Sequence, residues 1–184
     1  IVPQSEHLLQ DACYIIEQAK SIAFKAVNDT LVKRNWLLGM RIQHEVLQDQ
    51  RAEYGEQVIR NLAKELTGRF GSGYSRNNLY RFISFYKSFP QLFQLVGGNS
   101  DIVPSPTGQS EIVSATMGLL QESDIYSNLI PLHALRLSWT HYSIILQENN
   151  ADARAWYEQE AANEMWSTRT LQRNVASQYY HRLL

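Results

Sequence analysis

The residue types that most often carry catalysis show no catalytic spacing in this sequence. The five histidines are scattered, and no two have the spacing of a helical zinc site: they are His7, His44, His133, His141 and His181. The Gly-Ser-Gly at 71–73 lies between two helical patterns, and no Gly-Lys-Ser/Thr follows, so it is not a phosphate-binding loop. No serine lies in a Gly-x-Ser-x-Gly turn. We therefore predict no catalytic residue and no metal site in this chain.

The stretch YSRNNLYRFISFYKSFP (74–90) has the residue types of a nucleic-acid-binding helix. On a helical wheel at about 100° per residue, one side is apolar: Leu79, Phe82, Ile83, Tyr86 and Phe89. The opposite side is polar, and its arginine can bond to guanine or phosphate while its asparagine can pair with adenine. We predict that the contact residues here are Arg76, Asn77, Tyr80, Arg81, Ser84 and Lys87. The alternative is a face that only solvent covers.

A second stretch repeats this pattern near the C-terminus. YSRNNLYR (74–81) aligns with WSTRTLQR (166–173): an aromatic residue precedes a serine, a leucine follows four residues later, and an arginine two residues after that. A helix and a tight turn are expected before each copy, so we interpret both as helix-turn-helix-like units. Arg169 and Arg173 would form a second contact set. Chance similarity between two capped helices is the alternative.

The net charge of −1 argues against nucleic-acid binding, but the distribution of charge favours it. Residues 54–96 hold six basic and two acidic residues, a net of +4. Residues 97–150 hold one basic and five acidic residues, a net of −4. From Ser167 onward there are three arginines and no acids. Positive charge is therefore concentrated at the two repeated stretches.

Helical periodicity runs through almost the whole chain, and almost no segment alternates with a period of two, so we predict an all-α fold. A long helical segment comes first, from Ser5 to about Gln50, with apolar residues at three- and four-residue steps: Leu9, Ala12, Ile16, Ala19, Ala23 and Ala26. We interpret Cys13, on the same side, as a small core residue. Residues 1–96 would hold the long helices and the first helix-turn-helix-like unit, 97–130 a connection rich in Gly and Pro, and 131–184 the second unit. Together they would form one compact helical domain.

Serines are expected to cap three of these helices. Ser75, Ser138 and Ser167 each precede a helical pattern, and the Ser75 hydroxyl is expected to accept a hydrogen bond from a backbone N–H of the first turn. His141, three residues after Ser138, is expected to pack or form a hydrogen bond at its helix start. A role for His141 as a proton donor or ligand is the alternative, but no partner for it lies nearby in the sequence.

Cysteine usage and hydropathy give a weak indication of compartment. Cys13 is the lone cysteine, so no intrachain disulfide is possible, which fits a reducing compartment; we expect a cytoplasmic protein. No run approaches the ~18 apolar residues of a membrane span, so no membrane partner is expected. The chain starts without Met and stops at Leu184 inside a helical pattern, so we expect the natural protein to continue.

Two blocks of sequence carry a family resemblance. The segment YGEQVIRNLAKELTGRFGSGYSRNNLYRFISFYKSFP (54–90) is similar to family sequences that read Y-G-x-x-[LV]-[IL]-x-x-L-[AS]-x-[DE]-L. The segment LSWTHYSIILQENNADARAWYEQEAANEMWSTRTLQRNVASQYYHRLL (137–184) is similar to L-S-W-[ST]-H, R-x-[FW]-Y-x-x-[EQ]-[AS] and W-S-x-R-x-L-x-[RE]-[QN]-[IV]. Both blocks resemble the N-terminal domain of the YhcG family of bacterial proteins. AVNDTLVKRNWLLGMRI (26–42) fits the family's long leading helix, and 97–130 resembles its variable connection.

The resemblance implies a C-terminal PD-(D/E)XK nuclease domain after Leu184, and a parent protein that is a nuclease acting on DNA. No catalytic residue is carried over, because the family's catalytic carboxylates and lysine, with the divalent metal expected there, belong to that domain. This chain would be its helical DNA-binding or targeting part, with DNA as partner and no cofactor of its own. Asn77-Asn78 replaces a more charged pair often found in the family, which weakens any inference about individual phosphate contacts.

Other functions stay open at this point. The acidic 97–150 segment and the many aromatic residues also suit a protein-interaction or dimerisation module, such as a homodimer without direct nucleic-acid contact. Such a dimer would be isologous. A stand-alone enzyme is the third alternative, and no feature of the sequence favours it.

Overall fold

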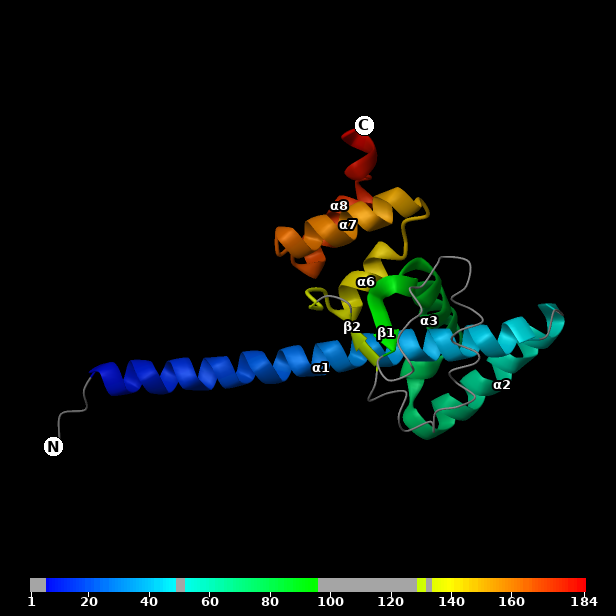
Figure 1. Ribbon diagram of the computed structural model, residues 1–184, viewed down its shortest axis with the longest axis horizontal. Coiled ribbons are helices and arrows are strands. Elements are labelled where there is room, and N and C mark those ends of the chain that lie inside the picture. The colour runs from blue at the N-terminus through cyan, green and yellow to red at the C-terminus, as the bar shows by residue number, and fades with distance from the viewer. Residues whose placement is uncertain (1–5, 49–51, 96–128, 132–133) are drawn as a thin grey trace.

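The computed structural model describes residues 6–48, 52–95, 129–131 and 134–184 (Figure 1). Over these residues the fold class is all-α, as predicted. The α-helices are α1 (Glu6–Gln48), α2 (Ala52–Phe70), α3 (Arg76–Ser88), α6 (Trp139–Ile145), α7 (Ala151–Asn163) and α8 (Thr168–Ala176). Single 3-10 turns cover Ser72–Tyr74, Pro90–Leu92 and Tyr180–Arg182. Most of the predicted connection, 97–130, lies outside the described residues.

A small antiparallel ribbon was not predicted. Strand β1 (Phe93–Leu95) pairs with β2 (Leu129–Pro131), so that Gln94 lies opposite Ile130. Each strand has three residues, which is too short to show an alternating pattern in the sequence. The ribbon follows α3 directly and places Phe93 in the core.

The long helix α1 and α3 cross in close contact. Helix α1 has 43 residues and is about 65 Å long at 1.5 Å per residue. At the crossing, a Cβ added to Gly39 would collide with the backbone carbonyl oxygen of Phe82. Glycine at this position therefore lets the two backbones approach, and a larger residue would separate α1 from α3.

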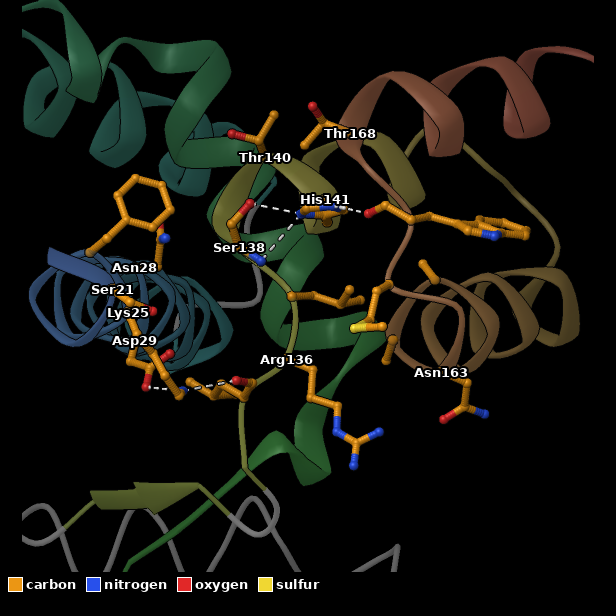
Figure 2. A pocket seen from close by; sticks show the side chains of 17 residues that line it. Ser21, Lys25, Asn28, Asp29, Arg136, Ser138, Thr140, His141, Asn163 and Thr168 are labelled. Atoms are coloured by element: carbon orange, nitrogen blue, oxygen red, sulfur yellow. Dashed lines mark hydrogen bonds and ion pairs between the residues drawn. The ribbon is translucent and has the colours of Figure 1, made fainter. Parts of the chain in front are cut away.

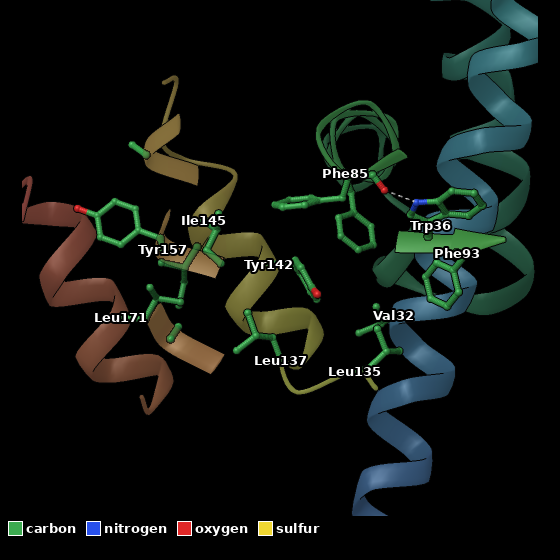
Figure 3. Close-up of a cluster of buried hydrophobic side chains, with 14 of the residues drawn as sticks. Val32, Trp36, Phe85, Phe93, Leu135, Leu137, Tyr142, Ile145, Tyr157 and Leu171 are labelled. Atoms are coloured by element: carbon green, nitrogen blue, oxygen red, sulfur yellow. Dashed lines mark hydrogen bonds between the residues drawn. The ribbon is translucent and has the colours of Figure 1, made fainter. Parts of the chain in front are cut away.

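The main core contains side chains from α1, α3, α6, α7 and α8 (Figure 3). It takes Val32 and Trp36 from α1, Phe85 from α3, Tyr142 from α6 and Tyr157 from α7, with other apolar residues around them. The Trp36 indole N–H donates to the Phe89 carbonyl at 2.8 Å in the interior. A second cluster packs α2 against α1 and α3 through Ile42, Ile59, Ala63, Leu79, Phe82 and Ile83.

Helix α3 buries its predicted apolar side and also Phe85, which was not part of that side. Four of the five predicted residues are buried and Tyr86 is half-buried. Phe85 was not predicted, yet it is fully buried, because α6 packs on a second side of α3. Its ring lies 5.3 Å from that of Trp139 and 4.8 Å from that of Tyr142, between centroids. The polar face of α3 is therefore narrower than the wheel suggests.

The prediction that the N-terminal half of α1 belongs to the core is wrong. Leu9 is 67% exposed and Ile16 is 53% exposed. Cys13, expected to be a small core residue, is exposed as well. In Figure 1 this half of the helix, in blue, extends away from the other elements. An apolar period identifies a face that favours burial, but it does not identify what buries that face.

The predicted serine caps differ in their hydrogen bonds. Ser167 is the N-cap of α8, and its hydroxyl accepts from the Thr170 N–H at 3.1 Å, as expected of a cap. Ser75 is the N-cap of α3, but its side chain forms no capping hydrogen bond, so that part of the prediction is wrong. Gly71, which follows α2, has the positive φ of 91° that glycine adopts without strain.

None of the helices in the described ranges combines the length and the apolarity that crossing a bilayer requires.

Candidate nucleic-acid interface

The structure places all six predicted contact residues of α3 on its surface. Arg76, Asn77, Arg81, Ser84 and Lys87 are exposed. Tyr80 is 38% exposed, which leaves part of its ring accessible for stacking. The six therefore lie along one accessible side of a helix whose other sides are fixed by α1, α2 and α6. The packed backbone fixes the points from which these side chains extend, which suits a binding surface built on a helix.

Arg76 differs from the others because it is already held by the protein. Its guanidinium donates to Glu56 Oε1 on α2 at 2.8 Å. The same oxygen accepts from Arg60 at 3.3 Å. The Arg76 guanidinium also lies 5.6 Å from the centre of the Tyr80 ring. Glu56 thus offsets part of the positive charge at the start of α3, and the pair links α2 to α3.

Arg81 and Lys87 carry charge that no carboxylate of the described residues neutralises. Within the described part of the chain neither forms an ion pair, and the Arg81 guanidinium only reaches the Asn78 amide oxygen at 3.4 Å. Two exposed arginines on α1 and α2 differ, because each is paired four residues along its own helix: Arg41 with Glu45 at 2.8 Å and Arg69 with Glu65 at 3.7 Å. Arg81 and Lys87 are therefore available to an external anion.

Helix α8 presents the second set in the same way. Arg169 and Arg173 are exposed one turn apart, and neither forms an ion pair among the described residues. Beneath them Leu171 is fully buried and anchors the helix. Arg182, which was not predicted, lies close to the end of α8, where it donates to the Ser177 hydroxyl at 3.2 Å. The chain turn at Gln178, with φ 51°, brings it there.

Helix α6 lies between α3 and α8, the helices that carry the two sets (Figure 3). It packs against α3 on one side and against α7 and α8 on the other. The structure therefore places the α3 and α8 residues on one rigid core, but it does not bring the two sets into contact with each other. A ligand that touched both would have to extend across or around α6.

His141 forms the predicted hydrogen bond at the start of its own helix, and it also links α6 to α8, which was not predicted. Its Nδ1 lies 2.8 Å from the Ser138 hydroxyl and accepts from the Ser138 N–H at 3.3 Å. Since Nδ1 accepts, the proton is on Nε2, which donates to the Trp166 carbonyl at 2.9 Å. This carbonyl precedes the N-cap Ser167, so the imidazole ties the start of α6 to the start of α8 (Figure 2).

A wide groove of about 980 Å³ lies beside His141, between α1 and the turn that joins α7 to α8 (Figure 2). The Lys25 ammonium on its α1 side donates to Asp29 at 2.7 Å and to the Leu135 carbonyl at 3.1 Å. Arg136 is exposed at its edge. The sequence did not predict this groove, because its walls come from segments more than 100 residues apart.

Four of the titratable groups with shifted pKa values are buried or half-buried: Tyr142, Glu158, His44 and Tyr86. Burial raises the pKa of the Tyr142 phenol, and the Glu158 carboxylate, which accepts from it at 3.0 Å, adds to the increase. Burial also raises the pKa of Glu158. Burial lowers the pKa of His44 and raises that of its neighbour Tyr86. None of these groups lies on the outer faces of α3 or α8, so their shifts reflect packing.

In the ranges that the structure describes, no three His, Cys, Asp or Glu side chains lie together as a metal site would require.

Comparison with known proteins decides the family. The model of the family described as "DUF1016 N-terminal domain" matches residues 11–182. The chain belongs to this family. Among curated proteins, "Putative nuclease YhcG" of Escherichia coli (strain K12) is 30% identical over 174 residues. That alignment covers 93% of this chain but 44% of the relative, so the chain spans less than half of that protein's length. The comparison with solved structures finds no significant match.

Proposed function

We propose that this chain is the helical DNA-binding or targeting domain of a bacterial PD-(D/E)XK nuclease. The observation that carries the proposal is a pair of exposed arginines without an ion pair among the described residues, at corresponding positions of two helices that each follow a serine: Arg81 on α3 and Arg173 on α8. Both helices are anchored by a fully buried leucine, so both arginines are presented from a rigid base. The name of the E. coli relative supports association with a nuclease.

The chemistry of the two faces suits a polyanion. Contacts to phosphate account for much of the affinity of proteins for DNA, and they come mainly from arginine and lysine. Arginine can hold two phosphate oxygens at once through its planar fork. Asn77 and Ser84 can add hydrogen bonds, and Tyr80, which is 38% exposed, can add a contact beside Arg81. The two helices would act as the reading elements of helix-turn-helix-like units, α2–α3 and α7–α8.

The test is a titration of fluorescent duplex and branched DNA with the wild-type chain and with Arg81→Ala/Arg173→Ala, at low salt. We expect the wild-type chain to bind and the double variant to lose most of the affinity, because two phosphate contacts are removed. The matched control is Arg41→Ala/Arg69→Ala, which removes the same charge from two exposed arginines that are paired with glutamates. The control should keep most of the binding.

Two results would reject the proposal. One is absence of binding by the wild-type chain at low salt. The other is equal loss in the control and in the double variant, which would show that net charge alone, and not these two positions, decides the affinity.

A protein-interaction module is the second candidate, and one observation favours it: the exposed apolar residues on the N-terminal half of α1. Light scattering separates the two functions when it is combined with the DNA titration. A dimer indifferent to DNA would favour the second candidate, while binding to DNA favours the first whatever the oligomeric state.

A further inference from the structure

The N-terminal half of α1 carries an apolar surface that no described element covers. Every side chain from His7 to Val27 is exposed. At about 100° per residue, all residues from Leu9 to Val27 that fall within one arc of about 140° are apolar. We name them the α1 stripe: Leu9, Ala12, Ile15, Ile16, Ala19, Ile22, Ala23, Ala26 and Val27. Its five large side chains are between 53% and 67% exposed.

The stripe is not an extension of the core. Residues of α1 that pack on α3, such as Gly39, lie roughly 160° around the helix from Ala19. Phe24 and Asn28, which line the groove toward α6 and α8, also lie on the side away from the stripe. The stripe therefore faces away from the rest of the domain. A continuous exposed apolar surface of this kind is uncommon on a monomer and marks an interaction site.

We propose that the α1 stripe binds the same stripe of a second copy of this chain, with the two helices antiparallel. The spacing supports a paired helix, because Ala12, Ala19 and Ala26 recur every seven residues, and Ile15 and Ile22 do the same. These two rows are three and four residues apart, which is the a/d spacing of a coiled coil. The proposal does not depend on the proposed DNA binding.

The antiparallel arrangement is favoured by side-chain volume. With Ile15 facing the partner's Ala19, Ile22 faces the partner's Ala12 across the same axis. Each large side chain then meets an alanine, which lets the helices approach closely without leaving a cavity. At the margin, Ile16 meets the partner's Ile16, and the contact remains apolar.

Charge favours the same register. The edge of the stripe carries Asp11, Gln18 and Lys25, again seven residues apart. In the antiparallel register Asp11 lies opposite the partner's Lys25, and Gln18 opposite the partner's Gln18. In a parallel pair, residues with the same number lie level, and Asp11 has no lysine opposite it. Opposite charges at these flanking positions set the orientation of paired helices.

Lys25 can accept this additional contact. Its ammonium has three N–H donors, of which two are used by Asp29 and the Leu135 carbonyl. Its side chain is 57% exposed. The stripe also ends at the right place, because Asn28 and Asp29, where α1 meets the domain, are half-buried. The partner's helix would therefore cover the stripe without entering the domain.

The contact area is consistent with a dimer. The stripe is about 30 Å long, and its large side chains expose roughly 100 Å² each. With the alanines, complete coverage would bury on the order of 600 Å² per copy, or at most about 1,200 Å² in total, which is the lower end of the range for specific interfaces. We therefore expect an equilibrium that depends on concentration.

The first test is light scattering of the chain over a range of concentrations. We expect the mass to rise toward twice 21.2 kDa, and we expect Ile15→Glu/Ile22→Glu to remain at the mass of one chain. Neither isoleucine belongs to a core cluster, so the variant should keep the thermal unfolding of the rest of the domain. A wild-type chain that stays monomeric, or a dimer that survives the substitutions, would overturn the proposal.

Orientation is tested by oxidative cross-linking in a Cys13→Ser background. Gln18→Cys places a thiol opposite its own copy in the antiparallel register, so we expect a disulfide-linked dimer. Gln10→Cys, on the far side of the helix, is the control and should give none. Cross-linking at 10 and not at 18 would overturn the arrangement. All these variants keep the α3 and α8 cations, so the result is independent of the DNA titration.

Discussion

Helices α3 and α8 carry the same sequence pattern in two different environments. Leu79 on α3 and Leu171 on α8 are both fully buried, and the arginine two residues later is exposed in each. Helix α3, however, is enclosed by α1, α2 and α6, whereas α8 packs on α6 and α7 near the end of the chain. The shared features are the anchor and the cation. The pattern therefore specifies which leucine anchors a helix and which arginine it exposes. The number of neighbouring helices decides how strongly the helix is held.

The capping serines show the same difference at the level of one hydrogen bond. Ser167 satisfies the Thr170 N–H, while Ser75 forms no side-chain capping bond and its own N–H donates to the Ser72 carbonyl at 3.3 Å in a 3-10 turn. A helix packed on several sides needs its cap less, because tertiary contacts already hold its first turn. The more exposed helix depends on it.

The largest difference between the two helices should appear when their anchors are shortened. Leu79→Ala and Leu171→Ala should each destabilise the domain by about 2–5 kcal/mol. Leu79→Ala should lie near the upper end, because helices on several sides hinder collapse of the cavity, and Leu171→Ala near the lower end. Urea unfolding followed by circular dichroism measures both. A larger cost for Leu171→Ala would show that α8 is the more rigidly held helix.

A smaller difference is expected at the caps. Ser167→Ala should cost about 1 kcal/mol, since it leaves the Thr170 N–H without its partner, whereas Ser75→Ala should change stability by only a few tenths of a kcal/mol. The same unfolding experiment compares the two variants. Equal costs would mean that Ser75 caps α3 in solution and that the two helix starts are equivalent.

Periodicity predicted much of the fold. The apolar side of α3 could be recognised because a half-buried helix must have one. Gly71 lies in the turn before α3, and Pro90 lies just after its end. Phe85 was missed because its burial depends on α6, which is more than 50 residues later. The close approach at Gly39 depends on two backbones meeting, and nothing local in the sequence indicates it.

The exposure of the candidate contact residues could be predicted from the sequence, but their ion pairs could not. That Arg81 and Arg173 are accessible follows from the wheel, since they lie opposite a buried leucine. That Glu56 holds Arg76 does not, because the two are 20 residues apart on different helices. The stripe on α1 was recognised as apolar but assigned to the core, because a sequence does not distinguish a face that packs within the chain from one that packs on a partner.

The salt dependence of DNA binding tests most directly whether the cations on α3 and α8 contact phosphates. The affinity should be measured from about 50 to 200 mM salt for the wild-type chain, for Arg81→Ala/Arg173→Ala and for the paired control Arg41→Ala/Arg69→Ala. If two phosphate contacts are lost, the slope of log K against log salt should become shallower by about 1.8 in the double variant, since each contact contributes about 0.9. The control slope should stay near that of the wild type. An unchanged slope in the double variant would contradict the account.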